Sequence, residues 1–82
     1  MNKEEIVEHL TQLNIDPQSY CVGGSFAEEQ YVIREEYSVW FVYYAERGLC
    51  SGVHRFTLEE EACSHFVGLL KSDTTTQLKS RN

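Results

Sequence analysis

Basic residues, long apolar runs and paired cysteines are all scarce in this sequence. Seven lysines and arginines stand against thirteen aspartates and glutamates, which gives a formal net charge of −6 at pH 7. A field of this sign repels phosphate backbones and anionic membranes, so we expect no direct contact with nucleic acid or with a membrane. The longest apolar run covers residues 39–45, far below the roughly 20 residues of a membrane-spanning helix. The partner that such a field attracts is a basic protein.

Only three cysteines are present, Cys21, Cys50 and Cys63, and their spacing fits no disulfide framework. We therefore expect reduced thiols and a cytoplasmic protein. Residues 1–13 contain three glutamates and no continuous apolar stretch, which predicts no secretory signal there. Neither a C-x₂₋₄-C nor an H-x₃₋₅-H pair occurs, and Cys63 and His65 point about 200° apart on a helix. The sequence thus predicts no metal site.

The patterns that announce an active site are missing as well. The Gly23-Gly24-Ser25 segment has neither the spacing nor the following lysine of a phosphate loop. No nucleophile elbow or supported base accompanies His9, His54 or His65. Adjacent carboxylates on a strand face opposite sides, and so small a core offers little room for the deep cleft that paired-carboxylate chemistry requires. We therefore expect no enzyme, no catalytic residue and no cofactor.

The composition that remains is typical of one small folded domain, with 41% hydrophobic and 12% aromatic residues in an 82-residue chain. Apolar residues at helical spacing predict a first helix over residues 3–13. Asn2, followed three residues later by Glu5, is a variant of the capping box. The helix should stop before Pro17, because the residue before a proline is driven out of helical geometry.

From residue 29 onward the residue types change to β-branched and aromatic, and they predict three strands, over residues 30–35, 39–46 and 53–56. The middle strand is apolar on both faces, which is typical of a central strand. Its aromatic residues could form a base-stacking platform as in sheet-based RNA binders. Because the flanks are acidic, we expect these aromatics to pack the core or to cover an open sheet face. Turns are predicted at residues 36–38 and 47–52.

A second helix is predicted over residues 58–71, with Thr57 as its cap and Glu60 at the reciprocal position of a capping box. The predicted fold is α+β in the order α-β-β-β-α, a three-stranded antiparallel meander packed against two helices on one face. Residues 1–71 should form the single domain. Residues 72–82 are polar and should form a flexible tail.

The carboxylates gather before the first strand, at the first hairpin and at the start of the second helix. Each can equally be a solvated charge or a partner of a helix dipole. The functional alternative is a carboxylate-rich surface that pairs with basic groups of a partner and raises association rate and specificity. An aromatic anchor within it would be Tyr37 at the hairpin tip. The predicted contact residues are Glu28, Glu29, Glu35, Glu36 and Tyr37, followed by Glu59 and Glu60.

Residues 31–70 carry a pattern that resembles small bacterial immunity proteins of polymorphic-toxin and contact-dependent inhibition systems. Its parts are a Tyr-Val-Ile strand (residues 31–33), Trp-x-Val-Tyr-Tyr-x-Glu-Arg-Gly (residues 40–48), Phe56 and a Glu-Ala-Cys helix (residues 61–63). The match covers about half the chain. The resemblance implies a non-enzymatic cytosolic protein that binds a cognate toxin domain and blocks its active site or substrate access. Such toxins are commonly nucleases with basic substrate grooves, which agrees with the charge.

The sequence therefore predicts an immunity protein that neutralises a basic toxin domain of the nuclease type by stoichiometric occlusion, as a monomer or weak dimer. Two alternatives stay open at this point. An acidic adaptor or regulatory subunit would bind a basic host protein without protecting against a toxin. A small ligand-binding domain or enzyme would need a pocket beside His54 or His65.

Overall fold

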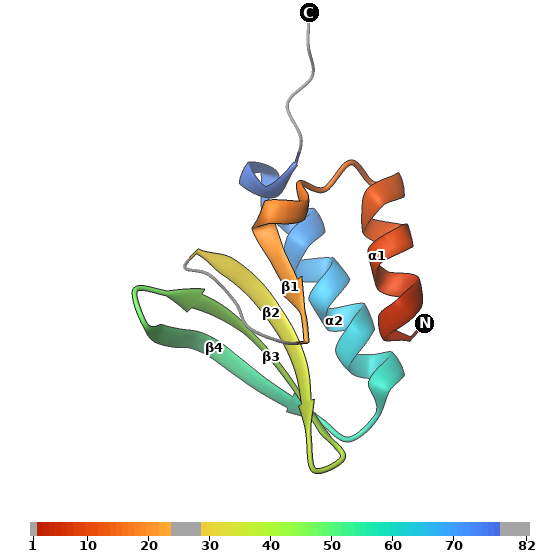
Figure 1. Ribbon diagram of the computed structural model, residues 1–82, viewed down its shortest axis with the longest axis vertical. Helices are drawn as coiled ribbons and strands as arrows, with labels where there is room; N and C mark the ends of the chain where they lie inside the picture. The colour runs from red at the N-terminus through yellow and green to blue at the C-terminus, as the bar shows by residue number, and fades with distance from the viewer. Residues whose placement is uncertain (1, 24–28, 78–82) are drawn as a thin grey trace, which may run out of the picture.

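Two helices and a four-stranded sheet form the computed structural model, which describes residues 2–23 and 29–77 (Figure 1). The helices are α1 (Lys3–Gln12) and α2 (Glu59–Ser72), and the short 3₁₀ helices are η1 (Pro17–Ser19) and η2 (Thr74–Thr76). The strands are β1 (Tyr20–Val22), β2 (Gln30–Glu36), β3 (Val39–Glu46) and β4 (Leu49–Phe56). Helix α2 lies against the sheet and α1 packs beside α2 (Figure 1). The predicted α+β class is confirmed.

The sheet has the strand order β1-β2-β3-β4. Strands β2, β3 and β4 form the predicted antiparallel meander, but the prediction of a three-stranded sheet is wrong, because β1 pairs with β2 in parallel. Strand β1 has three residues, and a segment of this length is too short for an alternating pattern to be recognised in the sequence. Tyr20 and Val22 nevertheless point to the helix-covered core, whereas Cys21 packs with the opposite side.

Both hairpin turns take backbone conformations that suit the twist of the strands they join. Tyr37 and Ser38 have φ values of 52° and 65°, and Arg47 and Gly48 have values of 50° and 78°. Positive φ at both central residues is the type I′ pattern of tight β-hairpins. The second turn is thus two residues long, and β4 begins at Leu49 instead of at the predicted residue 53.

The Ser51-Gly52 pair, which we predicted as part of a turn, lies inside β4 as a bulge. Val42 pairs with His54 and Tyr44 pairs with Ser51, so two residues of β4 stand opposite one residue of β3. Gly52 has a φ of 61°, a conformation that costs glycine little and most other residues considerably more. The glycine therefore indicates a strand irregularity here and not a chain reversal.

Strand β3 has buried side chains on both faces, as predicted for a central strand. Trp40 and Val42 join the core under the helices, whereas Tyr43 and Ala45 join Val32 in a second cluster on the opposite face. Trp40 and Tyr43 are only 7% and 5% exposed, which agrees with their predicted role in packing.

Asn2 caps α1 as predicted. Its side-chain oxygen accepts hydrogen bonds from the backbone N–H groups of Glu4 and Glu5 at 3.0 and 2.9 Å, and the Glu5 carboxylate accepts the Asn2 N–H at 3.0 Å. The predicted cap of the second helix is wrong. Helix α2 begins at Glu59 with Leu58 in the capping position and no side-chain cap, one residue beyond the start that a Thr57 cap requires.

Asn2→Ala should lower the free energy of unfolding by about 1 kcal/mol, because two N–H groups of α1 lose their acceptor. Thr57→Ala should change it by less than about 0.5 kcal/mol, since exposed positions away from caps are usually that tolerant. Urea unfolding of both variants measures the contrast. Equal losses would contradict the capping assignment.

The polar C-terminal segment differs from the prediction over residues 72–77. Helix α2 runs to Ser72, η2 follows, and Gln77 forms a bridge with Ile15. Thr76 is 3% exposed, and its hydroxyl donates to the Leu70 carbonyl at 2.8 Å. A buried threonine hydroxyl with an acceptor packs at little cost, so a polar composition did not prevent this segment from joining the domain. Residues 78–82 lie outside the described residues.

Candidate functional site

The N-termini of both helices and the β2–β3 hairpin lie at one end of the molecule (Figure 1). The backbone N–H of Lys3 donates to a carboxylate oxygen of Glu59 at 2.9 Å, which joins the two helix N-termini. Phe56 pairs with Trp40, so the start of α2 lies near the start of β3. We call this region the acidic end, and its carboxylates are Glu4, Glu5, Glu35, Glu36, Glu59, Glu60 and Glu61.

Three basic side chains lie at the acidic end, namely Lys3, Arg34 and Arg55. Seven carboxylates minus three cations leave a side-chain charge of −4 there. Arg34 forms an ion pair with Glu36. Arg34 and Arg55 are both cross-strand neighbours of Phe41, on the sheet face away from the helices. The helix side of the acidic end therefore carries nearly all of the uncompensated negative charge.

The structure brings together five of the seven predicted contact residues. Glu35, Glu36, Tyr37, Glu59 and Glu60 all belong to the acidic end or to the hairpin turn within it. Glu59 is half-buried and holds the Lys3 N–H, so it has a structural role.

Glu29 is separated from the others. It precedes β2 at its opposite end, where its N–H donates to the Ala45 carbonyl. At about 3.3 Å per residue, the length of β2 places it roughly 20 Å from Glu35. Glu28 lies outside the described residues.

Tyr37 is 97% exposed at the tip of the β2–β3 hairpin. Its positive φ is a consequence of the turn and would suit asparagine or glycine better. A large aromatic side chain in such a position packs against nothing in the described part of the chain, so its ring offers apolar surface to a partner.

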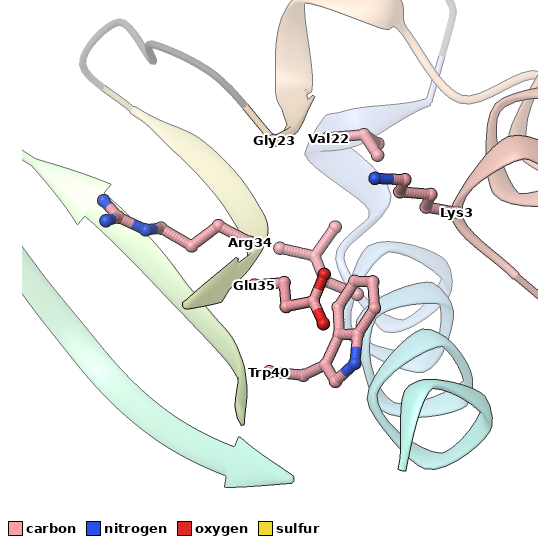
Figure 2. A pocket seen from close by; sticks show the side chains of 7 residues that line it. Lys3, Val22, Gly23, Arg34, Glu35 and Trp40 are labelled. Carbon is pink, nitrogen blue, oxygen red and sulfur yellow. The ribbon is translucent and has the colours of Figure 1, made fainter. Parts of the chain in front are cut away.

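A cavity of about 400 Å³ lies at the base of this hairpin, between the start of α1, the end of β1 and strands β2 and β3. Glu35 and Lys3 bring opposite charges to it, and Trp40 lines it with its indole. Figure 2 shows the Glu35 carboxylate beside the indole, the Lys3 amine across the cavity near Val22, and the Arg34 side chain directed away. The cavity was not predictable, because one of its walls is the end of β1.

The lining of this cavity combines charged and apolar side chains. Its described residues include no serine, cysteine or histidine, and its ionisable side chains are those of Lys3, Arg34 and Glu35. Neither His54 nor His65 lines it. Among the described residues, no three histidine, cysteine or acidic side chains gather as metal ligands. None of the described helices is long and apolar enough to cross a membrane.

Cys21 and Cys63 lack the low pKa of a reactive thiol. Burial raises the pKa of the Cys63 thiol to about 11, with Glu59 adding to the effect, and burial also raises the pKa of Cys21. Both thiols are therefore protonated near neutral pH and poor nucleophiles. Cys50 is exposed on β4.

His65 should make the stability of the folded protein depend on pH. Burial, and then the neighbouring His54, lower the pKa of His65 from its ordinary value of 6.5. As the pH falls below about 6.5, His65 therefore takes up a proton more readily in the unfolded state than in the folded state. The free energy of unfolding decreases from that pH down to the lower pKa that His65 has in the folded state. The melting temperature should drop more between pH 7.5 and 5.5 in the native protein than in His65→Gln.

Comparison with protein-family models, with curated proteins and with solved structures finds no match for the chain.

Proposed function

We propose that the protein is an immunity protein, which binds a basic toxin domain of the nuclease type and occludes its substrate groove. The observation that carries this proposal is Tyr37, 97% exposed on a hairpin tip amid the carboxylates of the acidic end. The resemblance of residues 31–70 to immunity proteins supports the same assignment.

The physical mechanism is charge matching around an apolar contact. Carboxylates of the acidic end take the places of substrate phosphates in the groove and accelerate encounter with the positive surface. The Tyr37 ring at the centre excludes water from the surrounding ion pairs, which strengthens them. Inhibition of this kind requires no bond to be made or broken by the immunity protein.

Glu35 and Glu60 are the carboxylates best suited to contact a partner. Both are exposed, and among the described contacts neither forms a hydrogen bond or an ion pair. Glu36 is already paired with Arg34 and Glu59 holds the start of α1. Reversal of Glu35 and Glu60 therefore tests binding with little effect on folding.

We expect a large toxin gene directly upstream of this gene. The test is co-expression with the C-terminal fragment of that toxin, followed by survival and affinity measurements, and the absence of such a gene would count against the proposal. Glu35→Lys with Glu60→Lys should weaken affinity at least about tenfold at physiological ionic strength, chiefly through slower association, and should reduce protection. Glu29→Lys with Glu46→Lys makes the same charge change at the opposite end and should alter affinity less than about twofold. Equal losses in both pairs would reject the acidic end as the contact surface. Binding without any protection would favour the acidic adaptor instead.

A further inference from the structure

Two histidine rings from different elements meet beside the edge of the sheet, away from the acidic cavity. His54 lies on β4 opposite Val42, on the helix side of the sheet, and His65 lies on α2. Their ring centroids are 4.5 Å apart, and the Phe56 ring lies 5.3 Å from His65. His54 is exposed and His65 is half-buried, so the pair is open to solvent on one side.

The β4 bulge determines which nitrogen of His54 is available. Its Nδ1 lies 2.8 Å from the carbonyl oxygen of Gly52. Because a carbonyl only accepts, Nδ1 is the nitrogen that carries the hydrogen and donates it, and Nε2 keeps its lone pair. A backbone carbonyl that holds the second ring nitrogen is the usual arrangement of a metal-ligating histidine.

His65 has a polar atom that the protein leaves unsatisfied. Its Nε2 is buried and has no hydrogen-bond partner among the described residues. A buried nitrogen without a partner carries a desolvation cost, and coordination of an ion would supply the missing interaction.

We propose that His54 and His65 form a binding site for a divalent transition-metal ion of the Zn²⁺ or Ni²⁺ type, with water in the remaining positions. Metal–nitrogen bonds of about 2.0–2.1 Å put the ion roughly 3.2 Å from each ring centroid. Two imidazoles on adjacent positions of one ion, with an N–metal–N angle of about 90° to 110°, therefore have centroids about 4.5 to 5.2 Å apart. The observed 4.5 Å lies at the lower limit of this range. Imidazole nitrogen selects these ions over Mg²⁺ and Ca²⁺, which prefer oxygen.

An ion in this position would join the edge strand β4 to α2. Among the described residues, β4 pairs with β3 alone, so it has fewer interactions to hold it than the central strands have. Two protein ligands make an open and moderately weak site, with a dissociation constant on the order of 10 µM. Binding should stabilise the folded state, and the stabilisation should grow with the logarithm of the ion concentration once that concentration exceeds the dissociation constant.

The test uses the full chain without an affinity tag and with Zn²⁺ alone as the probe at pH 7.5. The melting temperature should rise with the logarithm of the Zn²⁺ concentration above the dissociation constant, by about 10 to 20 °C at 1 mM Zn²⁺ for a domain of this size. His54→Gln and His65→Gln should abolish the rise. His9→Gln and Cys50→Ser should retain it, since those side chains lie on α1 and on the other sheet face, and Mg²⁺ should produce none.

His54→Gln is the decisive variant, because its exposed side chain can be changed without disturbing the core. His65 is half-buried, so the melting temperature of His65→Gln without metal must be measured first to show that the variant folds. A rise that persists in His54→Gln, or that disappears in His9→Gln or Cys50→Ser, overturns the proposed site. So does the absence of any rise in the native protein.

Discussion

Replacing Phe66 by alanine is expected to lower the free energy of unfolding by about 3 to 5 kcal/mol. Phe66 is the largest fully buried side chain, with 0% exposure, and it lies on the face of α2 that meets the sheet. Its ring meets Tyr20 edge-to-face, with centroids 6.3 Å apart, an arrangement that adds stabilisation beyond area burial. A domain of this size has a total stability of only about 4 to 12 kcal/mol, so the loss should remove a quarter or more of the total.

Phe66→Leu serves as the graded control, because it keeps most of the volume and should cost less than about 1.5 kcal/mol. Urea denaturation followed by circular dichroism measures both values. The midpoint should shift while the denaturant slope stays constant. A loss below about 1 kcal/mol in Phe66→Ala would show that this ring does not lie at the centre of the core.

Tyr37→Asn is expected to weaken the affinity for the proposed toxin partner by about 30-fold, equivalent to roughly 2 kcal/mol, because an exposed anchoring ring is lost. Asparagine is the better replacement than alanine, since it tolerates the φ of 52° found at this position. The melting temperature should therefore be unchanged or slightly higher. Titration calorimetry with the purified toxin fragment measures the affinity.

Ser38→Gly changes the neighbouring residue of the same turn and keeps the tyrosine. Because Ser38 also has a positive φ, glycine should preserve the hairpin and leave the affinity within about twofold. Native affinity in Tyr37→Asn, together with an intact fold, would remove Tyr37 from the contact surface. In that case the charge reversal of Glu35 and Glu60 would be the remaining test of whether the acidic end contacts the partner.

Strong local patterns made most of the fold predictable. Strand β3 has the predicted bounds, because eight residues apolar on both faces admit few alternatives. Helix α1 has the predicted start, since Asn2 and Glu5 satisfy each other within one turn. Strand β1 could not be predicted, because its three residues form a strand only through their pairing with β2. The Ser51-Gly52 pair looks like a turn in the sequence, and only the register with β3 identifies it as a bulge.

The candidate site was less predictable than the fold, because it depends on which chain segments meet. The contact between Lys3 and Glu59 joins residues 56 positions apart, and no local pattern announces it. The separation of Glu29 from Glu35 follows simply from the length of β2. The cavity beside Trp40 needs the end of β1, and the contact between His54 and His65 needs α2 to pack over β4. Charge clustering identified candidate residues but not their neighbours in space.

The two borders of the sheet make polymerisation by strand addition difficult. One border, β1, is only three residues long, and the other, β4, is interrupted at Gly52 by an extra residue that breaks the hydrogen-bond repeat. A neighbouring molecule therefore finds no long, regular row of amide groups to extend, which is how natural sheets avoid edge-to-edge aggregation. A protein that acts by stoichiometric binding, as we propose, has to be abundant, and this protection would keep it from aggregating at high concentration.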